Sequence, residues 1–313
     1  MKTINQILEP SYRNDKHREC TLVKFTENLV VRFRRIGKYR LAENYKCTIN
    51  RFMAFNHKDD MLFSDMTSSM IVEFESVMRT EGLTPNTTSY YIRNLRAIYN
   101  RAVDEGLTIE RNLFKHCYTG VAKTMKRAIP LEELKRLKAL NLSEEPEMEF
   151  VRDMFFFSFS TRGMSFVDMA YLRKNDLVGN MIVYRRKKTG QLLYIKCEPF
   201  IQEILDKYSL PSTPYLLPII RRNEHNARCQ YLSMARYINK RLKILGVRLQ
   251  LPIPLTMYVA RHSWASMAKS RNVPISIISQ AMGHDSEKTT RIYLSTLDNS
   301  QVDNVNSQIL KLL

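Results

Sequence analysis

Three side chains in the last third of the chain are of types that together can cleave a phosphodiester bond. Arg261 comes first, His284 follows 23 residues later, and Tyr293 lies nine residues after that. A guanidinium binds an anionic phosphate through paired hydrogen bonds, an imidazole transfers protons near neutral pH, and a deprotonated phenol is a nucleophile. Together these groups would attack a phosphate and hold the product as a phosphotyrosine ester.

The sequences around these three residues form motifs in the same order. Arg261 lies in ARHSWA, His284 lies in MGHD, and Tyr293 ends TTRIY. These motifs and their spacing resemble the tyrosine recombinases, the phage integrase family, and the resemblance covers nearly the whole chain. It implies an enzyme in which Arg261 grips a phosphate oxygen, His284 transfers protons and Tyr293 is the nucleophile, with no metal ion, ATP or other cofactor.

Two motifs depart from the common pattern of that family. The second motif usually has histidine three residues before its arginine, and Tyr258 occupies that place here. We expect Tyr258 to substitute for this histidine as a hydrogen-bonding group, and His284 to carry more of the acid–base work, because a phenol is no proton shuttle near neutral pH. In the first motif, Ser165 stands where arginine is usual and Asp168 takes the acidic place.

Arg162 is the predicted replacement for the missing first arginine. It lies three residues before Ser165, so on a helix the two would share a face, and its long side chain would reach the same phosphate. A single arginine would leave the charge of the transition state unbalanced. The alternatives are an ion pair between Arg162 and Asp168, or Ser165 itself as the phosphate ligand.

Lys188 belongs to the basic sequence RRKKTG, between two predicted strands. In the family, a catalytic lysine lies on such a hairpin, often before Thr-Gly, so the resemblance favours Lys188 over Lys187. An ammonium group there would protonate the leaving 5′ oxygen as a general acid. The alternative is a set of solvated hairpin charges.

The overall charge agrees with a polyanionic partner. The chain has 49 Lys and Arg against 31 Asp and Glu, a net charge of +18, which favours nucleic acid over an anionic membrane or a merely basic protein. Its five cysteines are scattered without a CxxC pair, which argues against disulfides and a zinc site. With no apolar leader or membrane span in the sequence, we expect a cytoplasmic protein that acts at the bacterial nucleoid.

Residues 21–110 are predicted to form a small helical domain. Apolar residues at helical spacing, with capping residues and glycines at the ends, predict helices near 21–36, 41–55, 65–80 and 84–106. The last of these resembles the final long helix of the family's core-binding domain. It carries Arg93, Arg96 and Arg101, which we expect to contact DNA phosphates, the alternative being solvated charges.

The predicted order is a lead-in at 1–20, the core-binding domain at 21–110, a basic linker at 111–129 and a catalytic domain at 130–313. Lys123, Lys126 and Arg127 of the linker are expected to follow the DNA backbone, as the resemblance implies. Turn residues separate expected strands at 176–178, 181–186 and 192–196. The fold class is therefore multidomain and mainly α, with a four-helix SAM-like core-binding domain and an α+β catalytic domain that contains a small antiparallel sheet.

The tail at 299–313 has apolar residues at helical spacing, which predicts a short amphipathic helix. They are Val302, Val305, Ile309 and Leu312. This helix would fold back on its own domain or dock on the next protomer, as such tails often do in the family.

The predicted function is site-specific DNA recombination through a 3′-phosphotyrosine intermediate. The resemblance implies double-stranded DNA with inverted-repeat core sites, a homotetramer on DNA, a monomer when free, and accessory DNA-bending proteins. Only about twenty residues precede the first predicted helix, too few for an additional arm-binding domain, so inversion or resolution is favoured over integration. The alternatives are a type IB topoisomerase and a non-catalytic DNA-binding protein with a degenerate site.

Overall fold

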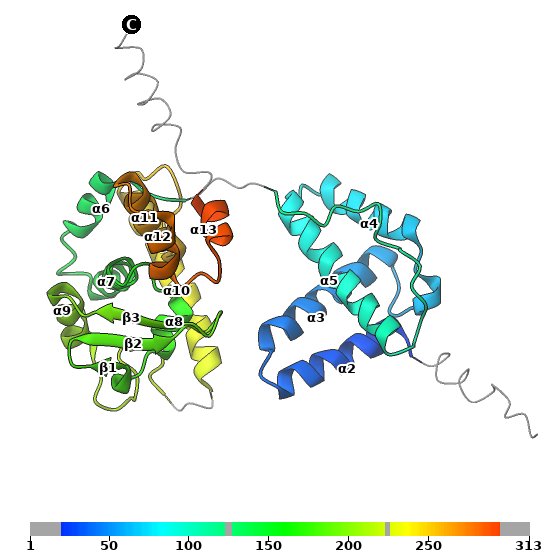
Figure 1. The fold of residues 1–313 in the computed structure, drawn as a ribbon, viewed down its shortest axis with the longest axis horizontal. Helices are drawn as coiled ribbons and strands as arrows, with labels where there is room; N and C mark the ends of the chain where they lie inside the picture. The colour runs from blue at the N-terminus through cyan, green and yellow to red at the C-terminus, as the bar shows by residue number, and fades with distance from the viewer. Residues whose placement is uncertain (1–19, 123–126, 223–225, 295–313) are drawn as a thin grey trace, which may run out of the picture. The chain divides into compact units, whose positions relative to one another are not determined.

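The structure, a computed structural model, describes residues 20–122, 127–222 and 226–294, except for two side chains on the last helix. The chain divides into two compact units, residues 1–123 and 124–313 (Figure 1). Within the described ranges, no helix is long and apolar enough to cross a membrane.

The first unit is helical. Its α-helices in the described ranges are α2 (Leu22–Arg35), α3 (Tyr39–Asn56), α4 (Ser68–Thr80) and α5 (Pro85–Asp104). Thr67 and Thr84 cap α4 and α5, because each side-chain oxygen accepts a hydrogen bond from an amide in the first turn. Aromatic rings of neighbouring helices meet edge to face in the shared core. The four predicted helices are confirmed.

The arginines of α5 differ in their surroundings. Arg93 and Arg96 are exposed, whereas the guanidinium of Arg101 lies 5.2 Å from the centre of the Phe33 ring. Nε of Arg101 also donates to the Tyr45 hydroxyl at 3.2 Å. Arg101 thus joins α5 to α2 and α3, and a DNA contact by any of the three arginines stays a prediction.

The segment 111–129, predicted as a linker, packs on the first unit over its first part. Leu113 and Phe114 are buried in the core of that unit, and the Ser89 hydroxyl on α5 donates to the Gly120 carbonyl at 2.7 Å. The first compact unit therefore continues past residue 110. A single apolar pair among charged residues carries no periodicity, so the sequence pattern did not indicate this packing.

The second unit combines helices with a small sheet (Figure 1). Its helices in the described ranges are α6 (Leu131–Lys138), α7 (Pro146–Ser160), α8 (Phe166–Tyr171), α9 (Pro199–Tyr208), α10 (Ala227–Arg248), α11 (Met257–Ser270), α12 (Ile275–Met282) and α13 (Glu287–Leu294). The antiparallel sheet has the order β1 (Leu177–Val178), β2 (Met181–Arg185) and β3 (Leu192–Lys196). The apolar helix α7 contacts α9, α10 and α11 and forms the centre of the core.

Most of the predicted elements of the second unit are confirmed, including β3 to the residue. Helix α8 was not predicted, because six residues give too little periodicity to recognise. The predicted tail helix at 299–313, Lys123, Lys126 and all but the last residue of the lead-in lie outside the described residues.

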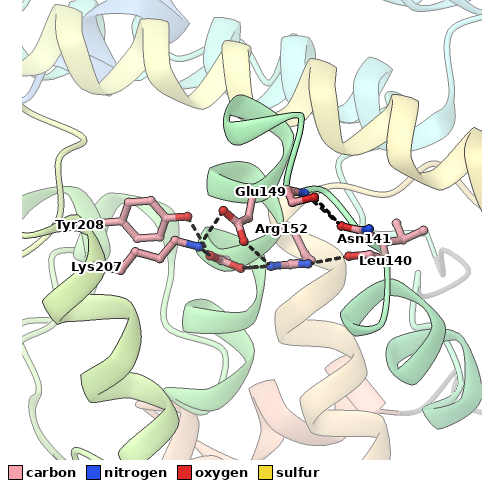
Figure 2. Close-up of polar contacts among 8 residues, drawn as sticks. Leu140, Asn141, Glu149, Arg152, Lys207 and Tyr208 are labelled. Carbon is pink, nitrogen blue, oxygen red and sulfur yellow. Dashed lines mark hydrogen bonds and ion pairs between the residues drawn. The ribbon is translucent and has the colours of Figure 1, made fainter.

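A buried carboxylate joins α7 to α9. Asp153 accepts hydrogen bonds from the Tyr208 hydroxyl at 2.7 Å, from Nζ of Lys207 at 3.1 Å and from Nε of Arg152 at 3.1 Å. Arg152 also donates to the Leu140 carbonyl at 2.8 Å, which adds the segment before α7 (Figure 2). These contacts keep the charge of Asp153 compensated inside the domain.

Replacement of Asp153 by alanine is expected to destabilise the second unit by about 3 kcal/mol, because it removes an acceptor from the largely buried Arg152 guanidinium and from the Tyr208 hydroxyl. Urea unfolding of the full chain, followed by circular dichroism, would measure the loss. Glu132→Ala is the matched control, since Glu132 is 74% exposed and pairs only with the nearby Lys135 in the recorded ion pairs. Equal unfolding curves for the two variants would contradict this role of Asp153.

Candidate active site

Arg261 on α11 is nearly buried, with 6% of its surface exposed. Its guanidinium donates to the carbonyl oxygens of Gly163 at 2.6 Å and Met282 at 2.7 Å. The Nη2 atom also lies 3.1 Å from Nε2 of His284. The side chain thus joins the turn after α7 to the end of α12, and it places a permanent positive charge beside His284.

The turn after α7 brings main-chain atoms directly against Arg261. Arg162 and Gly163 both adopt left-handed backbone conformations, with φ of 60° and 75°. The Gly163 amide donates back to the Ser158 carbonyl at 2.8 Å, which closes the helix end. A Cβ atom on Gly163 would lie 2.8 Å from Cα of Arg261. Glycine therefore permits both this conformation and the close approach of α11.

The change Gly163→Ala is expected to slow phosphodiester cleavage by roughly tenfold or more, because the added methyl group must push Arg261 or the turn by more than a few tenths of an ångström. The rate of covalent adduct formation on DNA would measure it. Gly179→Ala is the matched control: φ is +58° there too, but a Cβ atom would meet nothing within 4 Å. If both variants lost activity equally, backbone strain alone would be the cause.

His284 follows the left-handed residue that ends α12. Its Nδ1 lies 2.8 Å from Oγ1 of Thr290 on α13. Burial, followed by the positive charges of Arg261, Arg186 and Lys188, lowers the pKa of His284 to about 4. The imidazole of the DNA-free protein is therefore neutral at pH 7, and an arriving phosphate would offset part of this positive field.

Arg186 is a site residue that no sequence motif singles out. It lies just after β2 and is 7% exposed. Its guanidinium donates to the Gly283 carbonyl, and its Nε lies 3.9 Å from Oδ2 of Asp168. The signal that could have found it is strand alternation: Ile182, Tyr184 and Arg186 are buried in turn, which places Arg186 on the inward face and its basic neighbours on the other.

Asp168 holds the basic turn that follows β2. It is 3% exposed, and its carboxylate accepts the Lys187 amide at 2.8 Å and the Ser165 hydroxyl at 2.6 Å. Ser165 is the N-cap of α8, because its Oγ also accepts the Asp168 amide. The side chain at the position of the usual arginine thus has a local structural role, while the carboxylate positions the backbone next to Lys188.

Arg162 lies close to this group of residues but has different neighbours. The pKa of Tyr184 is raised overall, first by burial and then by the charge of Asp168. The charges of Arg261, Arg186 and Arg162 oppose this rise, so Arg162 lies near Tyr184. Arg186, by contrast, is buried and donates to the carbonyl of Gly283, the residue before His284. The structure therefore brings Arg186, rather than Arg162, next to the gathered residues of the candidate site.

Tyr258 lies in the first turn of α11, about one helical turn before Arg261. It is 57% exposed, and its ring meets that of His262 edge to face at 4.4 Å between centres. His262 itself is buried. Substitution of Tyr258 for the usual histidine stays a prediction.

Tyr293 lies on α13, and its side chain is outside the described residues. The next residue, Leu294, is buried against Ala265 of α11 and Ile278 and Met282 of α12. This packing fixes the helix that carries Tyr293 beside the two helices that carry or precede Arg261 and His284. Among the described residues, no group of three or more His, Cys, Asp or Glu side chains could hold a metal ion.

Comparison with known proteins gives one domain match and one sequence relative. Residues 21–120 match the model of the phage integrase SAM-like domain. The tyrosine recombinase XerD of Listeria monocytogenes is 22% identical to the chain over 236 residues, which cover 72% of this chain and 76% of XerD.

Solved structures show the same fold in both units. A lambda integrase dimer bound to a COC′ core site has a TM-score of 0.67 at 15% identity, covering 94% of this chain and 83% of that one. The XerH site-specific recombinase bound to palindromic difH substrate has a TM-score of 0.65 at 17% identity, covering 94% and 86%. The predicted fold class is thereby confirmed.

Proposed function

We propose that this chain is a tyrosine recombinase, which cleaves and rejoins DNA strands at specific sites through a 3′-phosphotyrosine intermediate; the match of residues 21–120 to the phage integrase SAM-like domain and the shared fold support it. The observation that carries the proposal is the convergence of two buried arginines on His284. Arg261 is in contact with its ring, and Arg186 binds the carbonyl of the preceding residue. The helix that carries Tyr293 also supplies the contact to the other ring nitrogen.

In the proposed reaction the phenol oxygen of Tyr293 attacks a DNA phosphorus atom. Its proton passes to Nε2 of His284, Arg261 and Arg186 bind the non-bridging oxygens, and the bond from phosphorus to the 5′ oxygen breaks. Lys188 donates a proton to the leaving 5′ oxygen. The phosphotyrosine ester conserves the energy of the broken bond, so the free 5′ hydroxyl of a partner strand reverses the step without ATP or a metal ion.

Arg186 takes the place of the first arginine of the family in this proposal. Its support is burial, the contact with the Gly283 carbonyl and its effect on the pKa of His284. Arg162 remains the alternative, because it lies on the turn that contacts Arg261. Ser165 is the weaker alternative, because its hydroxyl already bonds Asp168 and caps α8.

The proposed partner is double-stranded DNA with inverted-repeat core sites, bound by a tetramer. The net charge of +18 supports an electrostatic contact with the backbone, and exposed Arg93, Arg96 and Arg127 are available for it. A lambda integrase tetramer bound to a Holliday junction shares the fold, with a TM-score of 0.65. A need for DNA-bending proteins is proposed from the family resemblance alone.

The test is covalent trapping on a nicked suicide duplex that carries the inverted repeat found beside the gene. Denaturing electrophoresis should show a protein–DNA adduct, and peptide mapping should place the phosphate on Tyr293. DNA binding without any adduct would favour the degenerate DNA-binding protein. Relaxation of supercoils without exchange between two sites would favour the topoisomerase.

A further inference from the structure

The two ring nitrogens of His284 have chemically different neighbours. Nε2 lies 3.1 Å from Nη2 of Arg261, and an arginine can only donate hydrogen bonds. Nδ1 lies 2.8 Å from Oγ1 of Thr290, and a hydroxyl can accept or donate. The contact at Nε2 therefore restricts which nitrogen can carry the proton, whereas the contact at Nδ1 is compatible with either tautomer.

The arginine decides which nitrogen carries the proton. A proton on Nε2 would point at the positively charged donor of Arg261, so Nε2 must present its lone pair. The neutral ring then carries its proton on Nδ1, and Nδ1–H donates to Thr290. The doubly protonated ring would place two cations within hydrogen-bonding distance, which the field of Arg261, Arg186 and Lys188 disfavours.

Thr290 is placed to accept this Nδ1–H and to hold the ring in position. It is fully buried, it lies on the first turns of α13, and its amide is held by the Ser286 carbonyl. It also precedes Tyr293 by three residues, about one helical turn. Docking of α13 against α11 and α12 therefore fixes the Thr290 oxygen and, through it, the imidazole.

We propose that Thr290 is a positioning residue: its hydroxyl accepts the Nδ1–H of His284 and so holds the ring with its unprotonated Nε2 against Arg261, where the nucleophile and the phosphate would meet. This inference rests on the proposed function for its catalytic consequence, but the tautomer is a property of the DNA-free protein. The helix that delivers the nucleophile also orients the base that receives its proton.

The first test measures which ring nitrogen of His284 carries the proton. Nitrogen NMR of the full chain with labelled histidines, without DNA, should show Nδ1 protonated and Nε2 unprotonated for His284, assigned from the signal lost in His284→Gln. Thr290→Val has nearly the same shape but no hydroxyl, and it should lose this single state. Thr290→Ser should keep it. Unchanged His284 signals in Thr290→Val would overturn the proposal.

The second test measures catalysis on the suicide duplex. We expect Thr290→Val to slow adduct formation by about tenfold or more, because a small misplacement of a reacting group is costly, and Thr290→Ser to restore most of the rate. Thr289→Val is the matched control. Thr289 is the neighbour of Thr290 in the sequence, but it is exposed and its hydroxyl contacts Ser286. A rate in Thr290→Ser as low as in Thr290→Val would overturn the positioning role.

The two readouts separate the failures. If wild-type protein forms no adduct but its ring is held as Nδ1–H and released in Thr290→Val, the proposed function fails and the positioning of the ring stands. If the adduct forms at the wild-type rate in Thr290→Val, the catalytic consequence is wrong even though the proposed function holds.

Discussion

Tyr293→Phe is expected to abolish the covalent adduct on suicide DNA while leaving DNA affinity within about twofold. The change removes one oxygen atom, and that oxygen is the atom that would bond to phosphorus. No other group in the proposed reaction can form the ester, so the loss should be complete. Electrophoretic mobility shift and denaturing gels on the same samples would separate binding from cleavage.

Two other tyrosines make this prediction specific. Tyr258 shares the active-site helix with Arg261 and is 57% exposed, and Tyr194 on β3 is exposed to nearly the same extent. Tyr258→Phe should retain the adduct with at most a reduced rate, and Tyr194→Phe should behave as wild type. An adduct that persists in Tyr293→Phe and disappears in Tyr258→Phe would reassign the nucleophile and, with it, the reading of the last motif.

The helices and strands were predictable because local signals define them. Thr67 and Thr84 cap helices as their positions suggest, and the alternating residues of β3 bury Leu193 and Ile195 only. The extent of the first domain was not predictable. Leu113 and Phe114 join its core through contacts with helices far away in the sequence, and no local period marks such contacts.

The candidate site was predictable where a motif marks it and hidden where contacts define it. Arg261 and His284 were found from their motifs, and Nη2 of Arg261 lies 3.1 Å from Nε2 of His284. Arg186 was passed over because four consecutive basic residues look alike in a sequence. What distinguishes it is a hydrogen bond to Gly283, 97 residues away. The role of Thr290 was likewise invisible, because it depends on which side chain faces Nδ1 of His284.

Arg186→Ala is expected to lower the rate of adduct formation by about 10²- to 10³-fold, the effect of removing one positioned donor from a charged transition state. Arg162→Ala should lower it by less than tenfold, and Ser165→Ala should mainly weaken the N-cap of α8. The ranking rests on position: Arg186 is buried and donates to the Gly283 carbonyl beside His284, whereas Arg162 lies on the turn that Arg261 contacts through Gly163. Single-turnover cleavage of the suicide duplex would rank the three variants.

A buried arginine also supports the fold, so loss of activity alone would not identify its role. Free guanidinium ion added to Arg186→Ala should restore part of the rate if the missing group binds phosphate, because the ion supplies the same planar donors. Arg241→Ala, which removes an exposed ion pair with Glu147, should gain nothing from the ion. Rescue of Arg162→Ala but not of Arg186→Ala would return the first-arginine role to Arg162. Arg186 would then serve to hold the Gly283 turn beneath His284.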